Sequence, residues 1–287
     1  MFILPIICSA QVLNNKEGNA FTDKPFFNRE FIQKNRIKQL TGVYTYKKHG
    51  DIMRETEYIY VYRFDKNGNL ISTVETCPDD GSKDTVKNIY KYNDQNRLIA
   101  HLKTNQDGFQ SIYYEYDSLG RIISEEYKRE TVDTNHQVIK STTFNKERFV
   151  YEDFGLQTKR TRYNSYNLPY LDEFFNYNEH GYLVEQIERL KMTSEVRAIS
   201  YEYNEKGLLS AIRKKKNKED SYTEELTFEY DELGNLEQKH IYRNGVFTTD
   251  IQIIYNSKSK LISSIITRQV STGFLMILRF REFEYYN

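Results

Sequence analysis

Few side chains in this 287-residue sequence stand at spacings that could support catalysis or metal binding. The five histidines lie far apart, and none has a metal-ligand spacing to another His or to a Cys: His49, His101, His136, His180 and His240. The sequence contains no Gly-x-Ser-x-Gly nucleophile elbow, phosphate-binding loop or dinucleotide fingerprint. We therefore expect no metal, no cofactor and no catalytic residue.

Carboxylates are abundant, with 41 Asp and Glu in total, but no two of them stand out as a catalytic pair. A glycosidase would need two carboxylates that flank a glycosidic bond. The stretch from Asp65 to Asn69 has acidic and amide oxygens at calcium-loop spacing, yet it lacks the downstream bidentate Glu. We interpret it as a turn and retain a carbohydrate-active enzyme only as an alternative.

Tyrosine is the most abundant recognition chemistry, with 25 Tyr and 17 Phe but no Trp. A tyrosine ring offers a broad apolar face and a polar tip, and tyrosine is enriched at interfaces. The tyrosines outside the repeat described below are the ligand-binding candidates: Tyr113, Tyr127, Tyr166, Tyr170 and Tyr182. They indicate a carbohydrate or protein partner.

Most of the remaining aromatic residues belong to a repeat of about 27 residues. Each copy reads aromatic, any residue, aromatic, Asp or Asn, two residues, Gly, any residue, aliphatic. The copies supply four sets of structural residues: first aromatics Tyr62, Tyr90, Tyr114 and Tyr201; second aromatics Phe64, Tyr92, Tyr116, Tyr151, Tyr177, Tyr203 and Tyr230; turn residues Asp65, Asn93, Asp117 and Asp231; and glycines Gly68, Gly120, Gly155, Gly181, Gly207 and Gly234.

The spacing within one copy predicts two strands joined by a tight turn. Aromatics at i and i+2 share one face of a strand, with a polar residue between them on the other face. Asp or Asn caps the turn, and Gly three residues later takes the left-handed conformation that the turn needs. We expect about nine such two-strand units in an antiparallel meander. They include weaker copies at Tyr44–Tyr46 with Gly50 and at Tyr163–Asn167.

This pattern resembles the YD repeat of the RHS family, which includes bacterial polymorphic toxins, toxin-complex shells and teneurins. Tyr116-Asp117 and Tyr230-Asp231 match the signature pair, and the resemblance covers residues 41–287. It implies a β-repeat architecture and leaves a shell component or remnant of a toxin system as an alternative function. The Asp-Pro-rich boundary motif and a C-terminal toxin domain of the large toxins are not found in this sequence.

The repeat count predicts an all-β fold. A sheet of about 18 strands has more strands than open sheets usually hold without curling, so we expect an open or partly closed, barrel-like shell. The N-terminal segment, residues 11–40, precedes the repeat domain, and its residues 26–40 are the only helix-like stretch, with Phe31, Ile32 and Leu40 as an apolar stripe. We expect this segment to be a partly helical N-terminal cap over the first sheet edge.

The first ten residues read as a truncated signal sequence, with a short apolar run and small residues at Cys8 and Ala10. They predict an extracytoplasmic protein, periplasmic, secreted or on the outer surface. Lipidation of Cys8 is an alternative. The 41 basic residues balance the 41 acidic ones, which disfavours nucleic-acid binding, and no apolar run has the length of a transmembrane helix. The sequence thus indicates a non-enzymatic, exported bacterial β-repeat scaffold that binds a carbohydrate or protein partner.

Overall fold

The computed structural model describes residues 11–79, 82–105, 108–133, 138–216 and 221–287. Within them lie one helix, α1 (Arg29–Lys34), and one antiparallel sheet of 18 strands. The strands are β1 (Ile37–Lys47), β2 (Arg54–Phe64), β3 (Leu70–Asp79), β4 (Ser82–Tyr92), β5 (Leu98–Asn105), β6 (Gly108–Tyr116), β7 (Ile122–Val132), β8 (Val138–Phe154), β9 (Gln157–Tyr163), β10 (Pro169–Tyr177), β11 (Leu183–Leu190), β12 (Val196–Tyr203), β13 (Leu209–Lys215), β14 (Tyr222–Tyr230), β15 (Leu236–Arg243), β16 (Val246–Tyr255), β17 (Ile262–Gln269) and β18 (Phe274–Tyr285).

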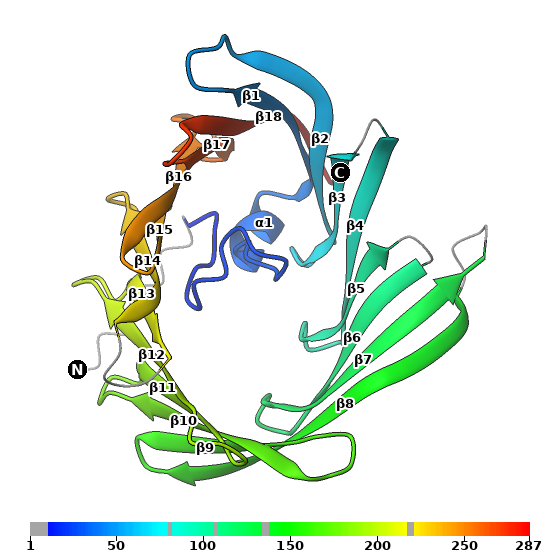
Figure 1. Ribbon diagram of the computed structural model, residues 1–287. Coiled ribbons are helices and arrows are strands. Elements are labelled where there is room, and N and C mark those ends of the chain that lie inside the picture. Colours follow the sequence, from blue (N-terminus) through cyan, green and yellow to red (C-terminus); the bar gives the residue numbers. More distant parts are fainter. Residues whose placement is uncertain (1–10, 80–81, 106–107, 134–137, 217–220) are drawn as a thin grey trace.

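The sheet is a closed barrel in which every strand pairs with the next one along the chain (Figure 1). The first and last strands also pair, with Tyr44 of β1 opposite Leu278 of β18. The predicted all-β antiparallel meander is therefore confirmed. The expectation of an open or partly closed sheet is wrong. The backbone N–H and C=O groups at the free edges of β1 and β18 pair with each other and close the barrel.

The Asp/Asn-to-Gly turns gather at one end of the barrel, which we call the repeat-turn end; the opposite end is the hairpin end. Asp117 shows how such a turn is built. Its backbone N–H donates to the carbonyl of Arg121 at 3.0 Å, and its Oδ1 accepts from the Arg121 N–H at 2.8 Å. Gly120 completes the turn with a φ of 85°. The register shifts by one residue beside Tyr116, which places the turn at a β-bulge.

The division into nine equal units differs in detail from the structure. The weak copies at Tyr44–Tyr46 and Tyr163–Asn167 end β1 and β9, so their turns lie at the hairpin end. Eight hairpins connect at the repeat-turn end, from β2–β3 to β16–β17. The ninth unit consists of β18 and β1, which come from opposite ends of the chain and are held together by strand pairing alone.

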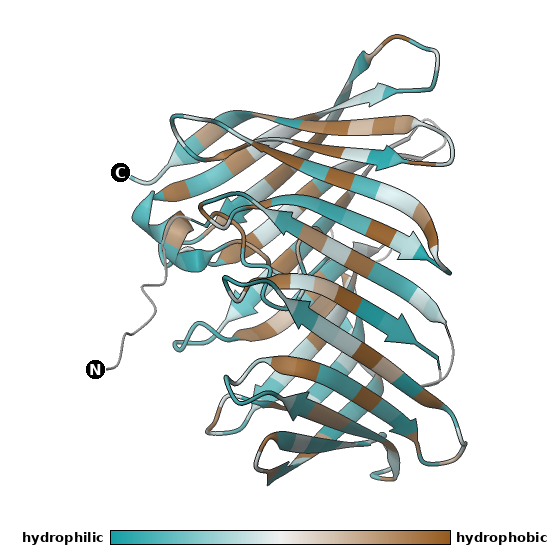
Figure 2. Cartoon of the chain, turned by 90° about the vertical axis from the view of Figure 1, so that its left-hand side faces the viewer, coloured by the Kyte–Doolittle hydropathy of each residue, from teal (hydrophilic) through white to brown (hydrophobic). Residues whose placement is uncertain are grey.

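Side chains alternate between the lumen and the outside along each strand, as the alternating hydropathy in Figure 2 shows. The repeat aromatics face the lumen, and the residue between each pair is exposed in five copies: Arg63, Lys91, Glu115, Glu202 and Glu229. The outer surface also carries ion pairs, such as Arg213–Glu225 at 2.6 Å and Lys159–Glu152 at 2.9 Å.

The only helix within the described ranges, α1, has six residues, and no helix there is long and apolar enough to span a bilayer.

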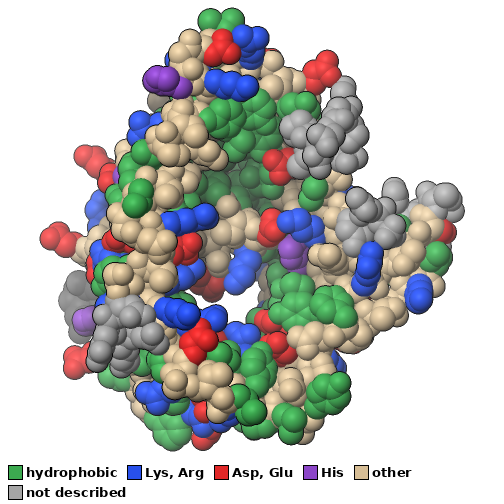
Figure 3. Space-filling model, in the orientation of Figure 1, with side chains coloured by type: hydrophobic (Ala, Val, Ile, Leu, Met, Phe, Trp, Pro, Cys, Tyr) green, Lys and Arg blue, Asp and Glu red, His purple; other side chains and the backbone are tan. Residues whose placement is uncertain are grey.

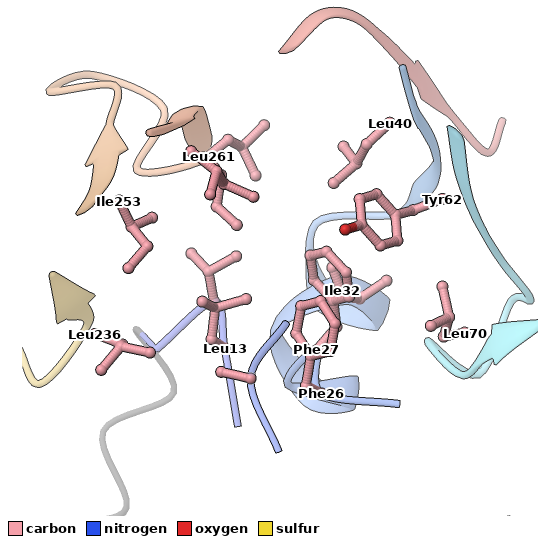
Figure 4. Packing of buried hydrophobic residues seen from close by; sticks show 14 of the residues in the cluster. Leu13, Phe26, Phe27, Ile32, Leu40, Tyr62, Leu70, Leu236, Ile253 and Leu261 are labelled. Carbon is pink, nitrogen blue, oxygen red and sulfur yellow. The ribbon is translucent and has the colours of Figure 1, made fainter. Parts of the chain in front are cut away.

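Residues 11–36 form a plug inside the barrel, at the centre of the ring in Figure 1, rather than a cap over a sheet edge. The closed sheet leaves no terminal edge for a cap to cover. α1 begins after Asn28, whose side chain accepts from the N–H groups of Glu30 and Phe31. The plug side chains Phe27 and Ile32 pack between opposite walls of the barrel, and the main hydrophobic core is the plug-to-wall interface (Figure 4).

Candidate ligand-binding lumen

Hydrogen bonds fasten the plug to both sides of the upper barrel wall. Lys239 of β15 donates its Nζ to the carbonyl of Ala20 at 2.8 Å, and Tyr90 of β4 donates its hydroxyl to the carbonyl of Asp23 at 2.7 Å. The plug fills only this part of the lumen. Figure 3 shows an opening through the rest of the ring, lined by basic and acidic side chains. The open part of the lumen is the candidate site.

A cavity of the lumen with a volume of about 850 Å³ lies between plug residues 16–24 and the wall formed by β9–β15. Phe21 of the plug lines it, together with four aromatic side chains of the barrel wall: Phe175, Tyr177, Tyr201 and Tyr203. All four come from repeat positions, which face inward for the reasons given above. The cavity is within the size range of small-molecule binding sites.

Polar groups converge on the same cavity. Lys214 Nζ and Glu224 Oε1 form an ion pair of 2.6 Å across β13 and β14, and Gln186 faces them from β11. Lys239 is 4% exposed, and burial lowers its pKa to about 8. Basic lining residues outnumber acidic ones: Lys16, Lys24, Arg160, Lys214 and Lys239 stand against Glu17 and Glu224. The arrangement offers aromatic faces, donors and acceptors, and a local excess of positive charge.

A buried ion cluster supports the floor of this cavity. The carboxylate of Glu173 is fully buried, and it accepts from Arg160 at 2.5 Å and from Arg162 at 2.8 Å. Burial by itself would raise the Glu173 pKa, but the hydrogen bonds from the two arginines outweigh it and hold the pKa below its ordinary value. The Arg160 guanidinium also lies 5.0 Å from the ring centres of Phe149 and Phe175. The cluster therefore fixes the position of a ring that lines the cavity.

At the repeat-turn end the cavity continues into a mouth of about 380 Å³. The two spaces share the lining residues Lys16, Tyr177, Leu183 and Tyr203. The ring of Tyr182, from the turn between β10 and β11, lies 4.7 Å from the ring of Tyr203. A line of aromatic rings thus leads from the surface into the lumen.

The structure places two of the five sequence-predicted ligand tyrosines along the open lumen. Tyr182 lies at the mouth. Tyr170 lies next to the ion cluster on β10, where burial and a hydrogen bond to Glu147 raise its pKa to about 12. Tyr127, on the luminal face of β7, donates its hydroxyl to Glu125 at 2.7 Å, away from the cavity lining.

The other two candidates lie outside the lumen. Tyr113 points to the opposite face of β6 from Tyr114 and donates its hydroxyl to Glu130 at 2.9 Å. Tyr166 is 84% exposed in the turn after β9.

Six of the tyrosines at or near the end of a strand share one structural contact. Each donates its hydroxyl to the backbone carbonyl of the residue that opens the strand before it. The pairs are Tyr92 with Leu70, Tyr116 with Leu98, Tyr151 with Ile122, Tyr203 with Leu183, Tyr230 with Leu209 and Tyr255 with Leu236. Their O···O distances run from 2.6 Å for Tyr116 to 2.9 Å for Tyr92 and Tyr203. Each hydroxyl thus supplies a hydrogen bond to a backbone carbonyl that directly follows a repeat turn.

Sequence reasoning missed the polar lining residues Arg160, Gln186, Lys214, Glu224 and Lys239, and the buried Glu173 that pairs with Arg160. The sequence did carry a signal for the two acidic residues of this set. Glu173 precedes Phe175 by two residues and Glu224 precedes Phe228 by four, so alternation puts both acids on the aromatic, luminal face. Within the part of the chain that the structure describes, no group of His, Cys, Asp and Glu side chains is arranged to hold a metal ion.

No protein-family model and no curated protein matches this chain. Among solved structures, a porin-like protein from Bacteroides uniformis is 10% identical, with 86% of this chain and 98% of that one covered and a TM-score of 0.31. A LolA superfamily protein from Nitrosomonas europaea is 7% identical, with coverages of 89% and 91% and a TM-score of 0.21.

A TcdB2-TccC3-Cdc42 structure is 11% identical over 81% of this chain, with a TM-score of 0.22, and the chain spans only 15% of that protein's length. TM-scores this low carry no argument about fold or function. The resemblance to YD repeats therefore stays a prediction from the sequence.

Proposed function

We propose that this protein is a non-enzymatic, extracytoplasmic binding protein that holds a carbohydrate ligand in the open part of its lumen. The observation that carries the proposal is the continuous space from the mouth at Tyr182 to the cavity at Lys239. Sugar rings present an apolar C–H face together with hydroxyls that both donate and accept hydrogen bonds. Aromatic rings beside Gln186, Lys214 and Glu224 offer the complement of both features.

The charge of the lining refines the expected ligand. Five basic lining residues against Glu17, Glu224 and the buried Glu173, which pairs with Arg160, leave a net positive charge that favours an oligosaccharide with carboxylate or sulfate groups over a neutral one. The plug argues for a binding protein over the alternative of a shell around a toxin, because residues 11–36 occupy lumen space that a cargo would need.

Calorimetric titration of the intact protein with matched acidic and neutral oligosaccharides tests the proposal. Two adjacent residues of β10 provide a matched pair of variants, because Phe175 faces the cavity while Phe174 faces outward. Phe175→Ala should weaken binding about tenfold or more, a change that corresponds to about 1.4 kcal/mol. Phe174→Ala should leave affinity unchanged. The absence of binding to every oligosaccharide, or an equal effect of the two variants, would overturn the proposal.

The same samples separate binding from catalysis. A carbohydrate-active enzyme would release shorter products from the bound oligosaccharide, and a single luminal change such as Glu224→Gln would abolish that release. A binding protein returns the oligosaccharide intact. Fractionation of cells that express the full gene tests the proposed location: recovery from periplasm or medium supports export, and recovery in the cytoplasm contradicts it.

A further inference from the structure

A second cavity lies on the other side of the plug, toward the hairpin end, and shares only the plug residues Phe21 and Thr22 with the carbohydrate cavity. It has a volume of about 340 Å³. Its walls are strands β1–β3 and β16–β18 together with plug residues 21–26. In Figure 3 hydrophobic side chains gather in a recess in this upper part of the ring.

The walls of this second cavity are largely apolar and aromatic. Ile251, Ile265, Met276 and Leu278 contribute aliphatic or thioether surface from β16–β18. Five aromatic residues also line it: Phe21, Phe26, Tyr44, Tyr60 and Tyr62. The rings of Tyr60 and Tyr62 lie 4.6 Å apart, and those of Phe21 and Phe26 lie 5.2 Å apart. Such a set of ring faces attracts organic cations.

One carboxylate in this aromatic setting has no cationic partner among the described residues. Glu75 of β3 faces the cavity and accepts a hydrogen bond from the hydroxyl of Tyr44 at 2.7 Å. Burial first, and the Glu75 charge second, raise the pKa of Tyr44, so this phenol stays protonated as the donor. No described Lys, Arg or His forms an ion pair with Glu75, whereas the other acid of the lining, Asp23, pairs with Lys103 at 2.7 Å.

The aromatic walls, the aliphatic surface and a carboxylate without a described ion-pair partner are three separate observations that agree on one ligand chemistry. We propose that this cavity binds an alkylammonium ion, with its cationic head on Glu75 and on the faces of Tyr44 and Tyr60. The alkyl part would lie against Ile265 and Leu278. This site is separate from the cavity of about 850 Å³ proposed to bind carbohydrate, so the ammonium proposal does not rest on the proposed function above.

Choline and its neutral isostere 3,3-dimethylbutan-1-ol are the probes, titrated by calorimetry into the intact protein. The two molecules have nearly the same shape, so only the charge separates them. We expect choline to bind at least about tenfold more tightly than the isostere, within the range that cation–π contacts and a carboxylate provide. Equal affinity, or no choline binding at millimolar concentration, would refute an ammonium site.

Two variants at acidic lining residues locate the site. Glu75→Gln should reduce choline affinity about tenfold or more, whereas Asp23→Asn should leave it nearly unchanged because Lys103 already neutralises Asp23. The reverse order would place the cation elsewhere and contradict the proposal. If Glu75→Gln fails to fold, the comparison of choline with its isostere in the unaltered protein still decides the question. Phe175→Ala should not change choline binding, which keeps this result independent of the carbohydrate proposal.

Discussion

The hydroxyl of Tyr203 donates a 2.9 Å hydrogen bond to the backbone carbonyl of Leu183, the residue that opens the neighbouring strand. Five other repeat tyrosines make the same contact around the barrel, so in these six repeats the second aromatic also bonds to the strand before its own. The repeat is thus a chain of local contacts between neighbouring units, as in other repeat architectures.

Removing one of these hydroxyls should weaken the barrel measurably. Tyr203→Phe keeps the ring and loses the hydrogen bond, so we expect the free energy of unfolding in urea to fall by about 0.5–1.5 kcal/mol. Tyr285→Phe is the control, since Tyr285 is 51% exposed, and it should have little effect. Indistinguishable unfolding curves for both variants would show that the contact adds nothing.

Gly68 couples a repeat turn to the plug. It has a φ of 82°, and a Cβ at this position would lie 2.1 Å from the carbonyl oxygen of Arg29 in α1. Gly181 has a similar φ of 79°, but nothing lies within 4 Å of its would-be Cβ. Gly181→Ala should therefore cost about 1–2 kcal/mol of backbone strain, and Gly68→Ala should cost more because α1 must move.

Limited proteolysis of the two glycine variants distinguishes strain from plug displacement. Faster cleavage within residues 11–36 is expected for Gly68→Ala only. Equal cleavage rates in the two variants would contradict a plug held against the turn.

The buried Glu173 should be costly to neutralise. Glu173→Gln leaves Arg160 and Arg162 without their carboxylate, and breaking a buried ion pair in this way typically destabilises a protein by about 3–5 kcal/mol. Glu152→Gln, which removes the exposed partner of Lys159 on the outer face, should cost at most about 1 kcal/mol. Urea unfolding of both variants checks the contrast, and costs of similar size would mean that water screens the luminal cluster as fully as the surface.

The stability of the protein should depend on Lys239 at alkaline pH. Burial lowers the Lys239 pKa to about 8 from 10.5, so between these values the unfolded chain binds more protons than the folded one. The free energy of unfolding therefore gains a favourable contribution as pH rises through this window. Lys239→Met should lack that contribution, and the stability difference between the variant and the unaltered protein should change steadily from pH 7.5 to about 9.5. A constant difference would show that Lys239 titrates normally in the fold.

The sequence determined the strands, their turns and their inward faces. The Tyr-x-Tyr spacing, the Asp or Asn cap and the left-handed Gly are local requirements, and local requirements can be seen in a single repeat such as Tyr114–Gly120. These features were enough to predict an antiparallel meander of about 18 strands.

Three features depended on contacts between distant parts of the chain. Closure requires β1 to meet β18, and their partners Tyr44 and Leu278 stand at opposite ends of the sequence. Residues 11–36 lie in the lumen and not over a sheet edge, because burial of Phe27 and Ile32 between opposite walls stabilises that position. The two cavities exist only because the plug fills part of a closed ring. Periodicity sets which way a side chain faces, but only the tertiary structure determines which faces meet.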